Sequence, residues 1–427
     1  MYIHRIKLKD FKGFSEVDFD LRIDHNKTAQ WNVFTGDNAS GKTALLKAIA
    51  IALVGPETSR ILMSSLKGFV KEGCSSAHIS LEIFPGDEDR FAGGGAPYKG
   101  AFWSEVKFSR LENDALQIEA DKLFRGNKKG PSRGLWSDST SGWFCAGYGP
   151  FRRLYGHSPE AQRIMSTSGK VTRFATLFRE DATLAESDLW LKDLNHRALS
   201  GDGAANETQR TVVSVLNDNF FPNGIKVERV DPDGLWLKQS DGTILDLRDM
   251  SDGFRSAAAL VMDILRNIVD VFGARNLVDE AGHVQHAGVV LIDEIDAHLH
   301  PKWQREIGSW FKRIFPRIQF LVTTHSPLIC QEADHGSIFH LPIPSGEEKP
   351  FRVSNSDYQK IITGKPDTIL LTSAFGLKHT RSVTAVKARN EYSLLQTKKR
   401  QASLTKEEEK RQMELSCFVD EEEPCEE

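Results

Sequence analysis

Hydrophobic and polar residues alternate in several stretches of the chain, a pattern typical of strands with one buried face. These stretches are residues 2–8, 17–21, 77–84, 102–108 and 225–247. The last one is broken by Asp233-Gly234 and Asp241-Gly242, dipeptides that fit tight hairpin turns. The alternation therefore predicts antiparallel strands in the N-terminal part of the chain and a separate set of hairpins further along.

Other stretches are mostly apolar and end in polar residues, which is typical of strands buried on both faces of a parallel sheet. They are residues 31–35, 288–292 and 319–323. Helical spacing of apolar residues predicts helices at 44–54 (stopping at Gly55-Pro56), 174–199, 207–220, 257–262, 367–377, 383–395 and after Leu404. Together these elements predict an α/β fold with a mixed sheet, an antiparallel β sub-domain, a helical insertion and a helical C-terminal appendage.

The 427 residues are enough for two or three domains, and the net charge of −4 is not that of a polycation. Any contact with nucleic acid must therefore come from a local patch. The five cysteines are scattered and lack metal-ligand spacing, which favours a reducing cytoplasm. Residues 1–14 lack the apolar core of a signal peptide, and no apolar run is long enough to span a bilayer. We therefore expect a cytoplasmic protein without membrane segments.

The segment Gly36-Asp37-Asn38-Ala39-Ser40-Gly41-Lys42-Thr43 fits the pattern G-x-x-x-x-G-K-[ST], between a predicted buried strand and a predicted helix. Such a loop directs backbone N–H groups at phosphate oxygens, and the helix adds the positive end of its dipole. Lys42 can reach the β- and γ-phosphates of a nucleotide, and the Thr43 hydroxyl can bind Mg²⁺. The predicted contacts to the nucleotide are Gly36, Asn38, Ser40, Gly41, Lys42 and Thr43. The alternative is a glycine-rich helix cap with a structural role only.

An acid pair, Asp293-Glu294, follows the apolar run at residues 288–292. In open α/β sheets, ligands bind at the carboxyl ends of the strands. Asp293 is placed to hold a metal ion, and Glu294 is placed to polarise the attacking water. The alternative, an acidic strand end in a solvated loop, is disfavoured by the phosphate loop upstream.

Two further stretches can reach a phosphate group. His325 follows the strand predicted at residues 319–323, and it is either a structural histidine or a contact to the γ-phosphate. Its place at a strand end favours the contact. Ser251-Asp252-Gly253 opens an apolar helix, so Ser251 can cap that helix, and the same turn is also a second anion cradle.

In this order, the four stretches resemble the ATPase heads of the ABC class, within the SMC, RecF and OLD-like branch. Gly36–Thr43 is similar to Walker A, residues 251–255 to the signature motif, residues 289–294 to Walker B, Asp296 to the D-loop and His325 to the switch histidine. Residues 293–301 and 323–327 most closely resemble the ATPase subunit of Septu-type anti-phage systems. The resemblance covers roughly residues 1–345.

This resemblance implies a P-loop NTPase fold of the ABC/SMC-head type, with ATP and Mg²⁺ as cofactors. It assigns Glu294, Asp296 and His325 to catalysis, and Thr43 and Asp293 to the metal. It also implies that Ser251 and Gly253 of one subunit cover the γ-phosphate held by another. The minimal unit would then be a homodimer of heads, or a higher homo-oligomer.

The chain departs from the family pattern in three places. Its signature reads Ser-Asp-Gly-Phe-Arg rather than the transporter form, and an extra loop is present at residues 274–287. No glutamine can be assigned to the Q-loop, so we expect the turn Tyr148-Gly149-Pro150 to take its place. That turn is expected to expose Arg152 and Arg153, either as a surface basic pair or, beside the nucleotide, as sensors of the γ-phosphate.

The predicted organisation has five parts. They are ATPase lobe I with its β sub-domain (1–155), a helical insertion (156–224), ATPase lobe II (225–345), a helical docking region (346–416) and an acidic tail (417–427). A basic loop at residues 126–134, next to Arg125, is either a solvated surface loop or a phosphate-backbone contact.

The docking region is basic between Lys378 and Arg411, and Thr405 and Glu408 have the spacing of a capping box. It is either a packing cap or a docking arm for a partner protein or DNA, and the apolar stretch at 372–377 favours docking.

No nuclease motif is found, since Asp357 and Asp367 are isolated acids. The resemblance to Septu-type systems therefore implies an ATP-hydrolysing regulatory subunit of a bacterial anti-phage complex that gates a partner effector, expected to be an HNH-type nuclease. The alternative is a RecF/SMC-like repair or recombination ATPase that binds DNA directly.

Overall fold

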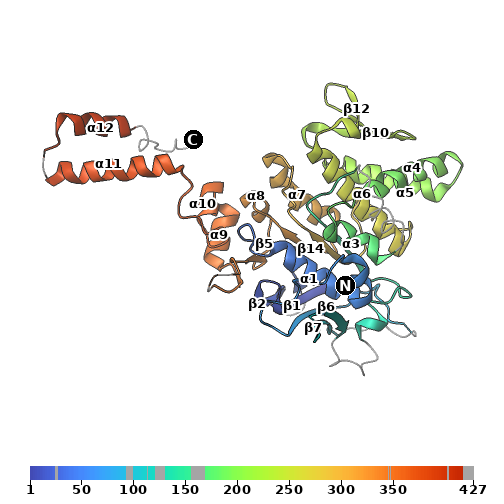
Figure 1. Ribbon diagram of the computed structural model, residues 1–427. Coiled ribbons are helices and arrows are strands. Elements are labelled where there is room, and N and C mark those ends of the chain that lie inside the picture. The colour runs from blue at the N-terminus through green and yellow to red at the C-terminus, as the bar shows by residue number, and fades with distance from the viewer. Residues whose placement is uncertain are drawn as a thin grey trace. The chain divides into compact units, whose positions relative to one another are not determined.

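The computed structural model describes residues 1–24, 27–92, 100–112, 114–120, 130–154, 169–344, 346, 348–401 and 403–416. It contains two compact units, Met1–Phe375 and Gly376–Glu427 (Figure 1). The predicted division into five parts stays a prediction, although the first unit extends thirty residues beyond the end predicted for lobe II at residue 345. Residues 125–129, which belong to the predicted basic loop, and the acidic tail at 417–427 lie outside the described residues.

The first unit is built from both strands and helices. The strands are β1 Tyr2–Phe11, β2 Phe14–Asp20, β3 Arg22–Asp24, β4 Lys27–Thr28, β5 Trp31–Thr35, β6 Ser76–Phe84, β7 Phe102–Arg110, β8 Leu116–Ala120, β9 Phe144–Tyr148, β10 Lys226–Asp231, β11 Gly234–Lys238, β12 Ile244–Asp246, β13 Gly288–Ile292, β14 Ile318–Thr323, β15 Ile338–His340 and β16 Phe351–Arg352. The α-helices are α1 Lys42–Leu62, α3 Lys170–Phe178, α4 Ala185–Leu199, α5 Gly203–Asn217, α6 Asp252–Phe272, α7 Pro301–Ile314, α8 Pro327–Cys330, α9 Asn355–Thr363 and α10 Pro366–Leu370. Short 3-10 turns are η2 Pro131–Arg133, η3 Pro222–Gly224 and η4 Leu247–Asp249.

A central six-stranded sheet has the order β16-β15-β5-β14-β13-β9. The five strands from β15 to β9 pair in parallel, and only β16 is antiparallel. Strands β5, β13 and β14 are buried along their whole length, as their apolar composition predicted, and so is β9. Because parallel strands end at the same edge, the sheet brings the phosphate loop, the acid pair and His325 to one side.

A second sheet is antiparallel, with the order β2-β1-β6-β7-β8, and it confirms the strands predicted from alternation. Helix α1 packs against this sheet and against the central one, so both of its faces are covered (Figure 1). The predicted stop at Gly55-Pro56 is wrong, because helical structure continues to Leu62 across a kink. Gly55 absorbs the kink with a φ of 81°, which glycine tolerates, and Pro56 starts the second segment, where its missing N–H costs little.

In its described part, residues 169–224, the predicted helical insertion contains α3, which packs on β9 and α1, and the helix pair α4 and α5. The three-stranded sheet β10-β11-β12 follows, with its turns at the two Asp-Gly dipeptides predicted to form them. In the first turn, the Asp231 carboxylate accepts hydrogen bonds from the N–H groups of Asp233 and Gly234, at 2.9 and 3.2 Å. Helix α6 then leads back to the central sheet.

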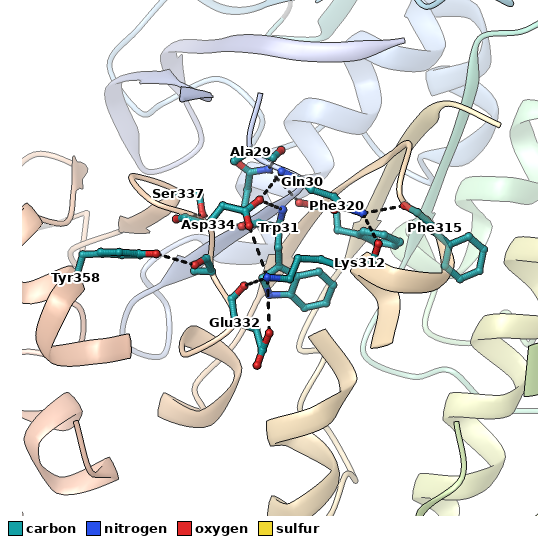
Figure 2. Close-up of polar contacts among 12 residues, drawn as sticks. Ala29, Gln30, Trp31, Lys312, Phe315, Phe320, Glu332, Asp334, Ser337 and Tyr358 are labelled. Carbon is teal, nitrogen blue, oxygen red and sulfur yellow. Dashed lines mark hydrogen bonds and ion pairs between the residues drawn. The ribbon is translucent and has the colours of Figure 1, made fainter. Parts of the chain in front are cut away.

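The opposite, amino edge of the central sheet holds a network of polar contacts (Figure 2). The Asp334 carboxylate accepts hydrogen bonds from the N–H groups of Gln30 and Trp31, at 2.6 and 3.0 Å. The Lys312 ammonium donates to the carbonyl of Glu332 at 2.7 Å and lies 3.5 Å from Asp334. This network fixes the start of β5, five residues before the phosphate loop begins.

The end of the first unit differs from the sequence-based expectation. Helix α9 was not predicted, because only Ile361 of its residues is buried and its periodicity is weak. The predicted helix at 367–377 is reduced to α10. The apolar stretch at 372–377 lies partly in the core, since Ala374 is buried and Phe375 packs against the core, so only Leu377 among its large residues is exposed.

The second unit contains a hairpin of two helices, α11 Val383–Gln401 and α12 Lys406–Ser416. The ion pair between Arg411 and Glu391, at 2.8 Å, joins the two helices. The predicted capping box is confirmed, because Thr405 N–H donates to Glu408 Oε2 at 2.9 Å and Glu408 N–H donates to Thr405 Oγ1 at 3.3 Å. Throughout the described chain, no helix is both long and apolar enough to cross a membrane.

Candidate nucleotide-binding site

The phosphate loop connects β5 to α1 and needs glycine at both ends. Gly36 and Gly41 have φ values of 146° and 94°, which other residues rarely adopt. A Cβ at Gly36 would lie 2.3 Å from the Leu341 carbonyl oxygen, and one at Gly41 would lie 2.5 Å from the Phe14 ring. No side chain caps the N-terminus of α1, so its first N–H groups are available to an anion.

Lys42 is buried inside this loop, with 6% of its surface exposed. Its ammonium donates to the carbonyl oxygens of Gly36 and Asp37, at 2.8 and 2.9 Å. Burial lowers the pKa of Lys42, while the nearby carboxylates of Asp293 and Glu294 oppose that shift. The ammonium therefore lies within the curve of the loop, where a phosphate oxygen could replace a carbonyl as its partner.

Asp293 lies at the end of β13 and is fully buried. One carboxylate oxygen accepts a hydrogen bond from the Thr43 hydroxyl at 2.7 Å, and the other accepts one from Thr323 at 2.6 Å. The sheet thus brings together two residues that are 250 positions apart in sequence and that were both predicted to hold the metal.

The donor set fits Mg²⁺. Mg²⁺ prefers oxygen ligands and is usually held by one or two protein groups, with water and substrate phosphates completing its shell. Thr43 and Asp293 supply two adjacent oxygens. Within the described ranges, no group of three or more His, Cys, Asp or Glu side chains could hold a metal by itself. The protein therefore offers two ligand oxygens, and phosphate oxygens and water can supply the others.

Glu294 and Asp296 follow Asp293 on a turn that two threonines hold. Glu294 has a φ of 46°, and its N–H donates to the Thr323 hydroxyl at 2.7 Å. The Thr324 hydroxyl donates to the Asp296 carboxylate at 2.6 Å. Sequence reasoning gave these threonines no role, although their position directly before His325 was a signal that could have been used.

The expectation that Arg152 is exposed is wrong, because only 4% of its surface is accessible. Its guanidinium points inward to the turn after β13, and burial lowers its pKa to about 10. Arg153 is exposed, as predicted. The two arginines therefore differ in environment, and the choice between a basic pair and γ-phosphate sensors stays open for Arg153 only.

The turn expected to replace the Q-loop does not present its tyrosine to a nucleotide. The Tyr148 side chain is buried, and its hydroxyl donates to the Asp263 carboxylate on α6 at 2.9 Å. The Tyr148 carbonyl accepts a hydrogen bond from Asp293 N–H at 2.8 Å. Tyr148 thus connects α6 to the strand end that carries the acid pair.

The predicted signature residues lie at the start of α6. Ser251 occupies the N-cap position as predicted, but its side chain makes no capping hydrogen bond and is exposed to solvent. Gly253 is buried, and a Cβ there would lie 2.3 Å from the His298 carbonyl oxygen. This close approach requires glycine. His325 is exposed just after β14, at the same edge of the sheet as the phosphate loop.

The parallel sheet, the phosphate loop and the acid pair define a P-loop ATPase. Two family models match the chain: "AAA domain" at residues 5–126, and "AAA domain, putative AbiEii toxin, Type IV TA system" at residues 159–331. These matches support an ATPase, and the sequence is similar to those of Septu proteins.

The relatives cover this chain to different extents. The chain is 26% identical over 331 residues to "Septu protein PtuA" of Bacillus mycoides (strain KBAB4). That alignment covers 77% of this chain and 38% of the PtuA protein. The chain is 32% identical over 153 residues to "Retron Ec83 probable ATPase" of Escherichia coli. That alignment covers 35% of this chain and 27% of the retron protein. The chain thus spans less than half the length of these relatives.

A solved structure of an SMC head bound to the C-winged helix domain of ScpA was also found. The alignment covers 84% of this chain and 100% of the SMC head chain, with a TM-score of 0.46 and 16% identity.

Proposed function

We propose that this chain binds ATP with Mg²⁺, hydrolyses it, and acts as the regulatory ATPase of an anti-phage defence complex. The observation that carries the proposal is the cluster of Thr43, Asp293 and Thr323, joined by hydrogen bonds of 2.7 and 2.6 Å, with Glu294 as the next residue. A metal-holding carboxylate beside a phosphate-loop threonine is the arrangement that nucleoside triphosphate hydrolysis requires.

In this mechanism, the loop N–H groups and Lys42 hold the β- and γ-phosphates. The predicted loop contacts are Gly36, Asn38, Ser40, Gly41, Lys42 and Thr43. Thr43 and Asp293 hold Mg²⁺, which when bound offsets charge on the phosphate oxygens. Glu294 orients the attacking water and accepts its proton, and His325 contacts the γ-phosphate. Asp296 is held by Thr324 and lines the turn that follows the acid pair.

A second copy of the chain completes the site in this proposal. The Ser251 side chain is exposed and makes no capping hydrogen bond, so its hydroxyl can contact a phosphate held by another subunit. Beside it, a cavity of 330 Å³ is lined by residues that include Arg153, Arg255 and His298. Ser251 and Gly253 therefore act on the nucleotide of the facing head, and ATP joins two heads into a homodimer or a higher homo-oligomer.

The defence role extends the proposal to a partner protein. Its support is the similarity to proteins named Septu PtuA and retron ATPase, together with the absence of a nuclease motif in the sequence. Residues 378–411 carry ten Lys or Arg against four Asp or Glu, so this region could dock an acidic partner surface. We propose that the partner is an effector, an HNH-type nuclease, whose activity ATP binding gates.

Purification from the native host, followed by mass spectrometry of proteins present in stoichiometric amount, tests the partner. A co-purifying nuclease whose cutting responds to ATP would support gating. If the chain purifies alone and instead binds DNA in an ATP-dependent manner with a steep salt dependence, the RecF/SMC-like alternative replaces it. Measured ATP hydrolysis by the purified chain tests the enzymatic part independently of any partner.

A further inference from the structure

Arg152 is a buried cation with an unusual set of partners, since three backbone carbonyl oxygens surround it. Its Nη1 donates to the carbonyls of Gly149 and Asp293, at 2.9 and 2.7 Å, and its Nη2 donates to the carbonyl of Glu294 at 3.0 Å. One guanidinium thus bridges the turn after β9 and both residues of the acid pair. Only the planar fork of arginine can make these bonds from one side chain.

The contacts restrain the backbone where it is least regular. Glu294 has a φ of 46°, in the left-handed region that glutamate rarely adopts. On one side its N–H is held by Thr323, and on the other its carbonyl oxygen is held by Arg152. Such a conformation persists only where the surroundings impose it. Arg152 is therefore part of what sets the direction of the Glu294 side chain.

The charge of Arg152 acts on the same groups. Burial lowers its pKa to about 10, and the carboxylates of Asp293, Asp296 and Glu294 oppose that shift. The guanidinium is therefore still charged at neutral pH, close to three acids at the strand end. With 4% of its surface exposed and its donors directed at backbone oxygens, the side chain is held away from solvent and from a γ-phosphate contact.

We infer that Arg152 is a positioning residue for ATP hydrolysis, which holds the backbone of Asp293 and Glu294 so that the water-orienting carboxylate faces the nucleotide. The inference rests on the proposed function, and it gives Arg152 a role through Glu294 and not through contact with ATP. It also explains how the chain can lack a Q-loop glutamine at this turn, because the turn after β9 is tied to the acid pair by Arg152 and by the Tyr148 carbonyl.

Arg152→Lys in the full-length chain is the first test. A lysine keeps the charge but cannot span three carbonyls, so Glu294 should lose its fixed direction. We expect kcat for ATP hydrolysis to fall by about 10- to 100-fold, the range expected when a catalytic group is displaced by about 1 Å. KM and the Kd for ATP, measured by calorimetry with Mg²⁺, should stay within about twofold of wild type, since Lys42 and the loop are untouched.

The split between kcat and KM separates positioning from a general loss of structure. A partly unfolded variant loses ATP binding and hydrolysis in proportion to its folded fraction, whereas a displaced Glu294 lowers kcat alone.

Arg317→Lys is the matched control. Arg317 also donates to a backbone carbonyl, that of Gln285 at 2.9 Å, but it lies at the amino edge of the sheet. Its substitution should leave kcat and KM unchanged.

A second variant covers the case in which Arg152→Lys does not fold. Arg152→Ala, prepared and assayed with millimolar guanidinium, should regain kcat in a saturable way, because the added ion can occupy the space of the lost group. Rescue by guanidinium but not by ammonium would support the fork-shaped contact.

The outcomes distinguish this inference from the proposed function. If the wild-type chain hydrolyses ATP and Arg152→Lys hydrolyses it equally fast, positioning by Arg152 is overturned while the ATPase assignment stands. Loss of ATP binding in the variant also overturns it, because Arg152 would then belong to the binding site. If the wild-type chain neither binds nor hydrolyses ATP, the proposed function fails and this inference fails with it.

Discussion

The two edges of the central sheet are built from the same kinds of residue but use them differently. At the amino edge, Asp334 and Lys312 pair with backbone groups and with each other, which closes the network (Figure 2). At the carboxyl edge, Lys42 and Asp293 also have partners, but these are loop carbonyls and threonine hydroxyls. A phosphate or a metal ion can replace such partners, whereas the Asp334 carboxylate is held by two backbone N–H groups and by the Lys312 ammonium. The difference separates a structural polar cluster from a binding site.

The largest expected effect is at the carboxyl edge. Glu294→Gln removes the group proposed to accept a proton from water, and hydrolysis should fall by about 10²- to 10⁴-fold. ATP binding should persist, so the variant should accumulate as an ATP-bound dimer, detectable by light scattering after gel filtration. Glu306→Gln, on the exposed side of α7, serves as the control with normal activity. Hydrolysis at the wild-type rate by Glu294→Gln would remove Glu294 from the mechanism.

Lys42→Ala tests the phosphate loop itself. The substitution removes a charged donor from the phosphates, and such hydrogen bonds contribute about 1.5–3 kcal/mol, so ATP should bind about 10- to 100-fold more weakly. Calorimetric titration with MgATP measures the effect, and Lys302→Ala on α7 is the surface control. Unchanged affinity would mean that the loop holds no phosphate.

Asp334→Ala tests the amino edge. The N–H groups of Gln30 and Trp31 lose their acceptor, so the free energy of unfolding should fall by about 1–3 kcal/mol. Denaturation followed by tryptophan fluorescence measures the loss, and Asp334→Asn, which keeps one oxygen, should lose less. KM for ATP should not change. A change in KM without a loss of stability would contradict the contrast between the two edges.

Thr323→Val has the smallest expected effect. It removes the hydroxyl that donates to Asp293 and accepts from Glu294 N–H, while the shape of the side chain stays similar. The free energy of unfolding should fall by about 1 kcal/mol, and kcat should fall by about tenfold through the displaced acid pair. Thr324→Val removes the hydroxyl that donates to Asp296 and accepts from the Ser326 N–H, and it leaves the contacts of Asp293 in place. Equal kcat in the Thr323 variant and wild type would show that the hydroxyl is structural only.

The sequence allowed the strands, the phosphate loop and the acid pair to be predicted, because each depends on local pattern. Alternation identified β6 and β7, and the motif around Lys42 gave the loop directly. The hydrogen-bond partners of these residues were harder to predict from the sequence. Asp334 lies more than 300 positions from Gln30, and Thr323 lies 30 positions from Asp293, so no short-range pattern connects them.

Arg152 shows why the remaining errors arose. Two adjacent arginines after a turn usually indicate a solvated surface, since isolated buried charges are costly. In this fold, three carbonyl oxygens compensate the burial of Arg152, and they come from the turn before it and from a strand end about 140 residues away. Likewise, α1 continues past Gly55-Pro56 because glycine supplies the positive φ at the kink and Trp136 covers it, donating to the Ala52 carbonyl at 2.8 Å.

The Thr323 hydroxyl has a single proton, and this limits which side chains can stand at position 293. That oxygen already receives the N–H of Glu294, and its proton is given to Asp293, so the side chain at 293 must present an oxygen on that side. An asparagine there could satisfy Thr323 only by turning its amide nitrogen toward Thr43. The nitrogen would then occupy the side from which the metal is to be held. The hydroxyl thus leaves an asparagine at 293 with one orientation, which satisfies the local hydrogen bonds but presents no oxygen on the Thr43 side.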